Sequence, residues 1–320
     1  MPTLSPEHSS ERLLERPRML VCDLDGTLLN SKGVMTEATV AALRLAVEEG
    51  VEIVFATGRR HNFAWKVLES VQLHDGTVLI SSNGAITRTL AGEHRQRLSM
   101  PVETALLLCR QLKSFRDSLI FTFERTGPGA LVVENIDALH ARIPRWVDSN
   151  AHEIECFVPL ERAFEGGDEP VQAMICGTLQ QMKEALLVLD DPAPAAMRLR
   201  SGLAIHRTEY ALRDLSIVDL MPYGCSKGNA IATLAAERGM DASDVACIGD
   251  NMNDADMLAY AGMPVVMKNA PAGLLAMAAA NGWAVTGSND EDGAAQAILR
   301  MLEGPARTVA DVEQVVVPAI

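Results

Sequence analysis

The sequence lacks the features that mark nucleic-acid-binding, membrane and zinc proteins. It carries only 28 lysines and arginines against 42 aspartates and glutamates, a formal net charge of −14, so no basic patch is available to bind a nucleic acid. Charge or glycine interrupts every apolar run before about 18 residues, the length that a membrane-spanning helix needs, so we expect no membrane contact. The six cysteines include no CxxC pair and no HExxH motif occurs, so the sequence does not support a zinc site.

The two ends of the chain differ from its middle in composition. Residues 1–17 are polar and charged and lack the apolar segment of a secretory signal, which predicts a flexible leader. Residues 305–320 start charged and end apolar, and three alternatives stay open for this tail: a packed arm, a dimer contact or a disordered segment. Most cysteines lie in apolar runs, as free thiols do in a reducing compartment. We therefore predict a cytoplasmic protein that is a monomer or a homodimer.

Strand-like and helix-like patterns alternate in two stretches, residues 18–87 and 220–304. Thr36 and Ser226 are placed as the N-caps of two of the helices. The alternation predicts an α/β fold whose core is a Rossmann-like, doubly wound sheet of mostly parallel strands. The strands of this core are expected at residues 19–22, 51–56, 77–80, 244–248, 263–267 and 282–285.

The alternation loosens in residues 88–219, between the two halves of the core. This stretch mixes helix-like and strand-like segments with breaks rich in proline, glycine and aspartate. It therefore predicts one inserted α+β domain of ordinary size. Its helices are expected near residues 102–113, 136–147 and 179–189, and strands at 119–123 and 131–133.

Asp23 and Asp25 directly follow the apolar run at residues 19–22. If that strand is central and parallel, its carboxyl end opens into the crevice where open α/β sheets bind their ligands. Two carboxylates so close need a cation, and Mg²⁺ is the oxygen-seeking ion that such a pair binds together with a phosphate. The alternative is a strand that ends in an ordinary Asp-Gly turn at Gly26.

Other polar segments follow or neighbour the predicted strands, and each has a purely structural alternative. Thr57-Gly58-Arg59 also fits a capped helix start, Asn83-Gly84 a hairpin tip, and Lys227 a solvent-exposed first helical turn. The acidic run at residues 249–256 does not fit a calcium-binding loop, because Met252 and Ala255 occupy positions that need an oxygen ligand and a glycine. A parallel sheet would bring these segments to one edge, and that agreement favours a shared active site.

In combination, these segments closely resemble the haloacid-dehalogenase-like (HAD) superfamily. The resemblance rests on Asp23-Leu24-Asp25-Gly26-Thr27, Thr57-Gly58-Arg59, Lys227 and Gly249-Asp250-Asn251-Met252-Asn253-Asp254. Asn83-Gly84-Ala85, Lys268-Asn269-Ala270 and the position of the insertion narrow it to the Cof-type branch, phosphatases with a type IIB cap. It covers the core and leaves out the leader, the interior of the insertion and the tail.

The resemblance implies a role for each matching residue. Asp23 would be the nucleophile that forms an aspartyl-phosphate, and Asp25 the general acid and base. Thr57 and the backbone at Gly58 would contact the phosphoryl group, and Lys227 would stabilise its charge.

Mg²⁺ would be bound by Asp23, the backbone carbonyl of Asp25 and Asp250. Asn253 and Asp254 would orient Asp250, Lys227 and metal-bound water. The substrate side of the site would include Gly58, Arg59, Asn83 and Gly84. For Arg59 a second possibility stays open, an ion pair with an acid of the core.

The insertion is expected to act as a cap that closes over the site and selects the leaving group. Its candidate contacts, each with solvated surface as the alternative, are Glu124, Arg125, His140, Arg142 and Arg145. The predicted function is Mg²⁺-dependent hydrolysis of small phosphomonoesters, sugar phosphates or related metabolites. The alternatives are a phosphomutase and a catalytically silent regulatory or binding member of the superfamily.

Overall fold

The first strand, β1 (Met19–Cys22), lies at the centre of the larger of two β-sheets. The other strands of this sheet are β2 (Glu52–Ala56), β3 (Val78–Ser81), β4 (Ile86–Thr89), β5 (His94–Arg97), β12 (Val245–Gly249), β13 (Met263–Met267) and β14 (Ala284–Thr286). Their order is β14-β13-β12-β1-β2-β3-β4-β5, and the pairs from β14 to β3 are parallel. This confirms the predicted α/β fold with a mostly parallel core sheet.

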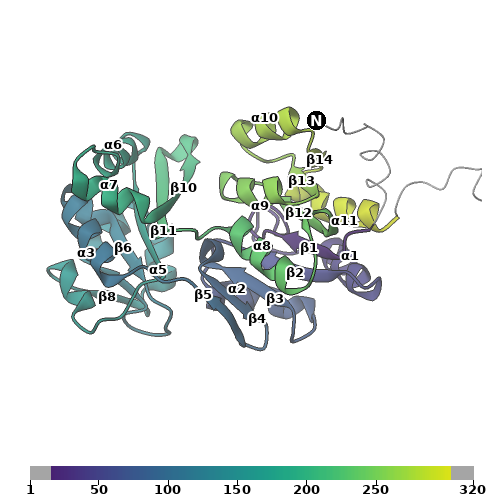
Figure 1. Cartoon of the computed structure of the whole chain (residues 1–320), viewed down its shortest axis with the longest axis horizontal. Coiled ribbons are helices and arrows are strands. Elements are labelled where there is room, and N and C mark those ends of the chain that lie inside the picture. Colours follow the sequence, from purple (N-terminus) through teal and green to yellow (C-terminus); the bar gives the residue numbers. More distant parts are fainter. Residues whose placement is uncertain (1–15, 304–320) are drawn as a thin grey trace, which may run out of the picture.

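The computed structural model describes residues 16–303, which form two bodies joined by two chain crossings (Figure 1). Of the predicted leader, only Arg16 and Pro17 fall within the described residues, and the predicted tail at 305–320 lies outside them. No helix of the described part is both long and apolar enough to cross a bilayer.

Helices cover both faces of the core sheet. One face packs against α1 (Glu37–Glu48), α2 (His61–Leu68) and α11 (Gly293–Glu303), and the other against α8 (Lys227–Glu237), α9 (Ala255–Tyr260) and α10 (Ala272–Asn281). All four residues of β1 are buried, because alternate side chains of a strand point to opposite faces and both faces are covered. The predicted N-caps are present: Thr36 accepts from the Thr39 amide at 3.2 Å, and Ser226 from the Asn229 amide at 3.1 Å.

The core sheet continues past the predicted start of the insertion. β4 pairs antiparallel with β3, and β5 with β4, so position 88 falls inside a strand of the core sheet. At the other end, β11 (Leu215–Pro222) belongs to the second sheet and extends past residue 219, where the insertion was expected to end. The sequence of β5, His-Arg-Gln-Arg, has no apolar face, so no strand was expected there. We propose residues 98–222 as the inserted unit.

The inserted unit is built on a six-stranded sheet of order β10-β11-β9-β6-β7-β8, antiparallel except for β7 and β8. Its further strands are β6 (Leu119–Thr122), β7 (Leu131–Val133), β8 (Ile154–Cys156), β9 (Gln172–Gly177) and β10 (Leu203–Tyr210). One face packs on α3 (Val102–Gln111), α6 (Leu179–Leu189) and α7 (Pro194–Ser201). Part of the other face packs on α4 (Ile136–Arg142) and α5 (Pro144–Asn150), and the rest faces the core.

Sequence patterns identified the insertion's interior less completely than the core. The expected helix at 136–147 is two helices, because Pro144 cannot continue α4 and starts α5 instead. Strands β9, β10 and β11 were not expected. β10 is an edge strand in which only the first residue, Leu203, is buried, so it lacks the apolar run of an internal strand.

The six cysteines provide a test of the packing. All are free thiols; Cys156 is exposed and the other five are buried. Burial raises the pKa of Cys109 to about 12 and that of Cys176 to about 11, which keeps these thiols protonated and unreactive. We expect a maleimide to label the native protein at Cys156 alone, as read by peptide mass spectrometry. Cys156→Ser should abolish native labelling, whereas fast labelling of this variant would contradict the packing described here.

Candidate active site

Asp23 lies immediately after β1, at the carboxyl edge of the core sheet. Its backbone amide donates to the carbonyl of Ile248 in β12 at 3.0 Å, which fixes the loop beside the neighbouring strand. Its side chain is only 7% exposed. The ammonium of Lys227 donates to Oδ1 of Asp23 at 2.6 Å. The sequence-predicted nucleophile and its cation are therefore in direct contact.

Lys227 is fully buried, contrary to the exposed alternative for a lysine in a first helical turn. It is the first residue of α8, whose start is fixed by the Ser226 cap. The Gly84 loop packs tightly against this helix start: a Cβ on Gly84 would lie 2.3 Å from the carbonyl oxygen of Ser226, and Gly84 has φ +101°. Only glycine fits this close approach and this backbone angle. Asn83-Gly84 thus forms the hairpin turn between β3 and β4 and also positions the lysine.

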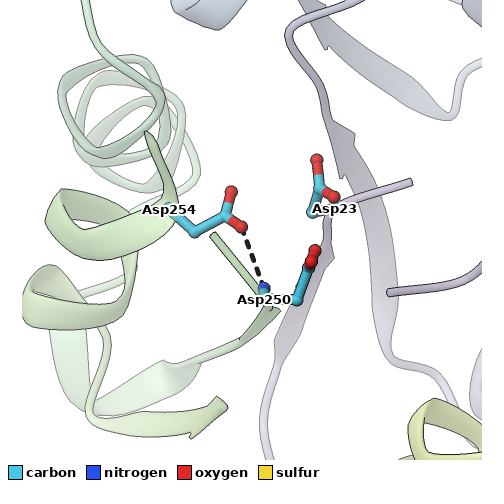
Figure 2. Close-up of side chains that lie close together, drawn as sticks. All are labelled: Asp23, Asp250 and Asp254. Carbon is cyan, nitrogen blue, oxygen red and sulfur yellow. Dashed lines mark hydrogen bonds between the residues drawn. The ribbon is translucent and has the colours of Figure 1, made fainter. Parts of the chain in front are cut away.

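Three carboxylates, those of Asp23, Asp250 and Asp254, face a common space at this edge (Figure 2). One oxygen from each lies within 4.8 Å of the others, and all three residues are buried. Lys227 contacts two of them, since it also donates to Oδ1 of Asp254 at 2.6 Å. Three carboxylates and one ammonium leave a balance of two negative charges in this cluster.

The charge excess is reflected in the pKa values of the cluster. Burial raises the pKa of Asp250 to about 7, and the charge of Asp254 adds to the effect. Burial also raises the pKa of Asp23 well above its usual range, against the opposing charge of Lys227. Burial alone would lower the pKa of Lys227, but Asp23 and Asp254 hold it above its usual value. A divalent cation would compensate the excess negative charge.

Asp254 is held by its protein partners on both oxygens. Oδ1 accepts from Lys227, and Oδ2 accepts from the backbone amides of Asp250 and Asn251 at 2.9 Å each. Figure 2 shows the bond to the Asp250 amide. This arrangement fits an orienting role better than a metal-ligand role, because few lone pairs remain free.

Asp250 is positioned by residues around the first loop. Thr27 donates its hydroxyl to Oδ1 of Asp250 at 2.9 Å. A Cβ on Gly26 would lie 2.3 Å from Oδ2, so the glycine gives the carboxylate its room. Asn269 donates to the carbonyl of Gly26 at 2.8 Å and lies 3.5 Å from Oδ2 of Asp250. Asn269 belongs to the Lys268-Asn269-Ala270 motif, for which the sequence alone indicates no role.

The donor set of this cluster fits Mg²⁺, a hard cation that prefers carboxylate and carbonyl oxygens and retains waters. Asp23 and Asp250 offer buried carboxylate oxygens with excess negative charge. The softer ligands that favour zinc, histidine and cysteine, are not part of the cluster found among residues 16–303.

The side chain of Asp25 is directed to Arg59. Arg59 donates from Nε to Oδ2 at 2.6 Å and from Nη2 to Oδ1 at 2.5 Å, a bidentate ion pair. Hydrogen bonding to Asp25 raises the pKa of Arg59. The Asp25 side chain is 56% exposed, so the pair lies at the mouth of the site. Of the two possibilities for Arg59, the ion pair with an acid of the core is present, and the contact with substrate stays a prediction.

Thr57 and Asn83 join two neighbouring loops. The backbone amide of Asn83 donates to the carbonyl of Thr57 at 3.0 Å. A Cβ on Gly58 would lie 3.1 Å from the side-chain Oδ1 of Asn83. Asn83 also accepts from Nδ2 of Asn253 at 3.0 Å. The side chain of Asn253 thus contacts the β3 loop, and its expected role in orienting Asp250, Lys227 and metal-bound water stays a prediction.

A cavity of about 650 Å³ extends from this edge to the inserted unit. The core side is lined by Asp23, Asp25, Thr57, Gly58, Arg59 and Asn83, among others. The inserted unit contributes residues from β9, β10, β11 and α5 that sequence reasoning missed, including Gln172, Tyr210, Asp219 and Trp146. One signal was available for Asp219, a single acid within the apolar run of β11.

Of the five polar residues proposed from the sequence of the insertion, Arg145 lines this cavity. The other four have partners away from it. Glu124 pairs with Arg88 and Arg97, and Arg125 donates to the carbonyl of Gly129 and pairs with Asp168. His140 pairs with Asp148, and Arg142 donates to the carbonyl of Asp214.

Several known proteins are similar to this chain in sequence. The sequence model of the haloacid dehalogenase-like hydrolase family matches residues 20–298. Phosphatase YwpJ of Bacillus subtilis (strain 168) is 29% identical over 308 residues, 89% of this chain and 100% of that protein. An Arabidopsis thaliana protein named chloroplastic endoribonuclease YBEY is 28% identical over 93% of this chain, and the chain spans 50% of that protein's length.

A solved structure of a haloacid dehalogenase-like hydrolase from Bacteroides thetaiotaomicron has the same fold. Its TM-score is 0.71 at 25% identity, with 89% of this chain and 100% of that chain covered. The sequence match runs from β1 into α11 and so includes the inserted unit. The resemblance first noted in the motifs is thereby confirmed, and the chain belongs to the haloacid dehalogenase-like hydrolase family.

Proposed function

We propose that this protein hydrolyses small phosphomonoesters with Mg²⁺ through an aspartyl-phosphate on Asp23. The observation that carries the proposal is the buried cluster of three carboxylates with Lys227. Its excess negative charge suits a divalent cation, and its position at the carboxyl edge of a parallel sheet suits a phosphate. The phosphatase relative that matches over its whole length also supports it.

In the proposed reaction, a carboxylate oxygen of Asp23 attacks phosphorus and the ester P–O bond breaks. Asp25 gives a proton to the leaving oxygen and later takes one from the water that cleaves the aspartyl-phosphate. Lys227, the Thr57 hydroxyl and the Gly58 amide stabilise the negative charge that spreads over the phosphoryl oxygens. Mg²⁺, held by Asp23, Asp250 and the Asp25 carbonyl, would supply further charge stabilisation when bound.

The acid role of Asp25 requires a rearrangement within the site. Both of its carboxylate oxygens accept hydrogen bonds from Arg59 in a bidentate pair. Transfer of a proton from Asp25 therefore requires that this pair separate during the reaction.

Part of the lining of the site cavity comes from the inserted unit, so we propose that the inserted unit selects the leaving group.

Phosphate release from a panel of phosphomonoesters tests the proposed function. We expect release that depends on Mg²⁺, stops in a chelator and returns when Mg²⁺ is restored, because the cluster offers only oxygen ligands. Excess Ca²⁺ should inhibit, since its larger coordination shell distorts the in-line geometry. Full activity in a chelator would contradict the metal requirement. Conversion of a hexose 1-phosphate to the 6-phosphate without phosphate release would identify a phosphomutase instead.

Thermal unfolding tests the metal site without turnover. Mg²⁺ should raise the Tm. At a Mg²⁺ concentration a hundredfold above Kd, the free energy of unfolding should increase by about 2.7 kcal/mol. Asp250→Asn should lose most of this shift because it removes a proposed ligand. Asp148→Asn, the same change at an exposed position of the inserted unit, should keep it. An equal Mg²⁺ shift in both variants would exclude Asp250 as a ligand.

A further inference from the structure

Asp219 is a carboxylate on the wall that the inserted unit presents to the site cavity. It lies on β11 among apolar residues and lines the same cavity as Asp23. Within residues 16–303, no lysine or arginine forms an ion pair with it, and the basic side chain that affects its pKa is that of His206, its partner on β10. A carboxylate without a strong cation partner, facing a phosphate site, needs another source of stabilisation.

The two oxygens of Asp219 differ in how well they are satisfied. Oδ1 accepts a short hydrogen bond from Nε2 of Gln172 at 2.6 Å. Oδ2 lies 3.4 Å from Nδ2 of Asn83, longer than an ordinary hydrogen bond. Because a carboxylate has about four acceptor positions, Oδ2 retains the capacity to accept from a ligand. Gln172 meanwhile holds the group in place.

Asn83 places Asp219 beside the phosphoryl-binding loops. Its backbone amide is bonded to the Thr57 carbonyl, and its side-chain oxygen lies against Gly58. Asp219 therefore lies one side chain away from the residues that would contact the phosphoryl group. A leaving group attached to that phosphoryl group would extend along this wall of the cavity.

The surroundings of Asp219 strengthen any hydrogen bond that it makes. In the sheet it lies between Met174 of β9 and His206 of β10, its direct partners on the two neighbouring strands, and Ile217 lines the cavity two residues earlier on β11. Burial raises the pKa of Asp219 to about 6, while the hydrogen bond from Gln172 opposes this shift. In such partly apolar surroundings a donor that pairs with the carboxylate is favoured, and a second anion is strongly disfavoured.

We propose that Asp219 selects the leaving group: it accepts a hydrogen bond from a hydroxyl or amino group there and rejects a leaving group that places an anion there. This inference rests on the proposed phosphatase function and deepens it. Asp219 is a specificity residue, since its target is the part of the substrate that differs from one ester to another.

Glycerol 3-phosphate and 3-phosphoglycerate test the inference, because they differ in one group, a hydroxymethyl in the first and a carboxylate in the second. We expect the wild-type enzyme to have the higher kcat/KM for glycerol 3-phosphate. Asp219→Asn removes the charge with little change of shape and should reduce this preference roughly 10- to 100-fold. The kcat/KM for p-nitrophenyl phosphate, which has no hydroxyl or amino donor, should change less than about threefold.

Asp148→Asn is the matched control, an exposed position of the inserted unit outside the cavity, and should leave all three values unchanged. If Asp219→Asn has a lowered Tm, Asp219→Ser replaces it and should show the same loss of preference. An equal loss on all three esters would overturn the inference and make Asp219 a support for Asn83. A wild-type enzyme without preference for glycerol 3-phosphate would also overturn it. Failure of wild-type enzyme to release phosphate from any ester would instead contradict the proposed function.

Discussion

Asp23→Asn should reduce phosphate release on every substrate by on the order of 10⁵-fold, as removal of a catalytic nucleophile does. The asparagine has nearly the same shape but cannot form the acyl-phosphate bond. Wild-type enzyme quenched during turnover should carry an acid-stable, hydroxylamine-sensitive phosphoryl adduct on the peptide containing Asp23, as read by mass spectrometry. The variant should carry none.

The fold of Asp23→Asn should survive the change, which separates lost chemistry from lost structure. The variant removes one negative charge from a cluster with two in excess, and Lys227 keeps its contact with Asp254. Since burial raises the pKa of Asp23, its ionised form is disfavoured in the metal-free fold. We therefore expect the Tm of the metal-free variant at pH 8 to equal or exceed that of the wild type.

Asp250→Asn distinguishes the nucleophile from a ligand. If Asp250 only holds the metal, higher Mg²⁺ concentrations should recover part of the activity of Asp250→Asn but none of the activity of Asp23→Asn. A phosphoryl adduct in Asp23→Asn on another residue would show that the nucleophile is misassigned.

Lys227→Met should lower both stability and turnover. The fully buried ammonium bonds two buried carboxylates, and its removal leaves them without a cation. Breaking a buried ion pair from one side costs about 3–5 kcal/mol, which a shift of the denaturant midpoint measures. The exposed control Lys268→Met, whose partner Glu291 lies 3.7 Å away, should cost about 1 kcal/mol or less.

Turnover of Lys227→Met should fall by on the order of 10²-fold or more on every substrate, because the ammonium would face the phosphoryl group that all substrates share. Adding Asp254→Asn removes one of the orphaned charges, so the double variant should regain part of the stability but not the turnover. A Lys227→Met enzyme that loses one substrate and keeps another at full rate would make Lys227 a recognition residue.

The sequence alone determined most of the core. Strand β13 and the caps at Thr36 and Ser226 lie where they were predicted, and the carboxylates at Asp23 and Asp250 directly follow strands β1 and β12. These features are local: alternation, capping side chains and strand ends depend on residues a few positions apart. Because parallel strands share an edge, local predictions also brought together loops that are distant in the chain.

The tertiary structure decided which partners the side chains have. The sequence left it open whether Arg59 pairs with an acid, and its bidentate pair with Asp25 depends on how two loops face each other. Lys227 and Asp23 are 204 positions apart, and the burial of the lysine follows from the close packing of α8 on the Gly84 loop.

The structure also decided which strands belong to which sheet and what the inserted unit contributes to the site cavity. β5 has no apolar face and β10 is a half-exposed edge strand, so neither carries the pattern that identifies a strand. Asp219 and Gln172 face the site because of the antiparallel register of β9 and β11 and the placement of their sheet against the core. The sequence determined the elements and the chemistry at their ends, because both are encoded locally. Long-range packing, which depends on the whole chain at once, decided which of these groups meet.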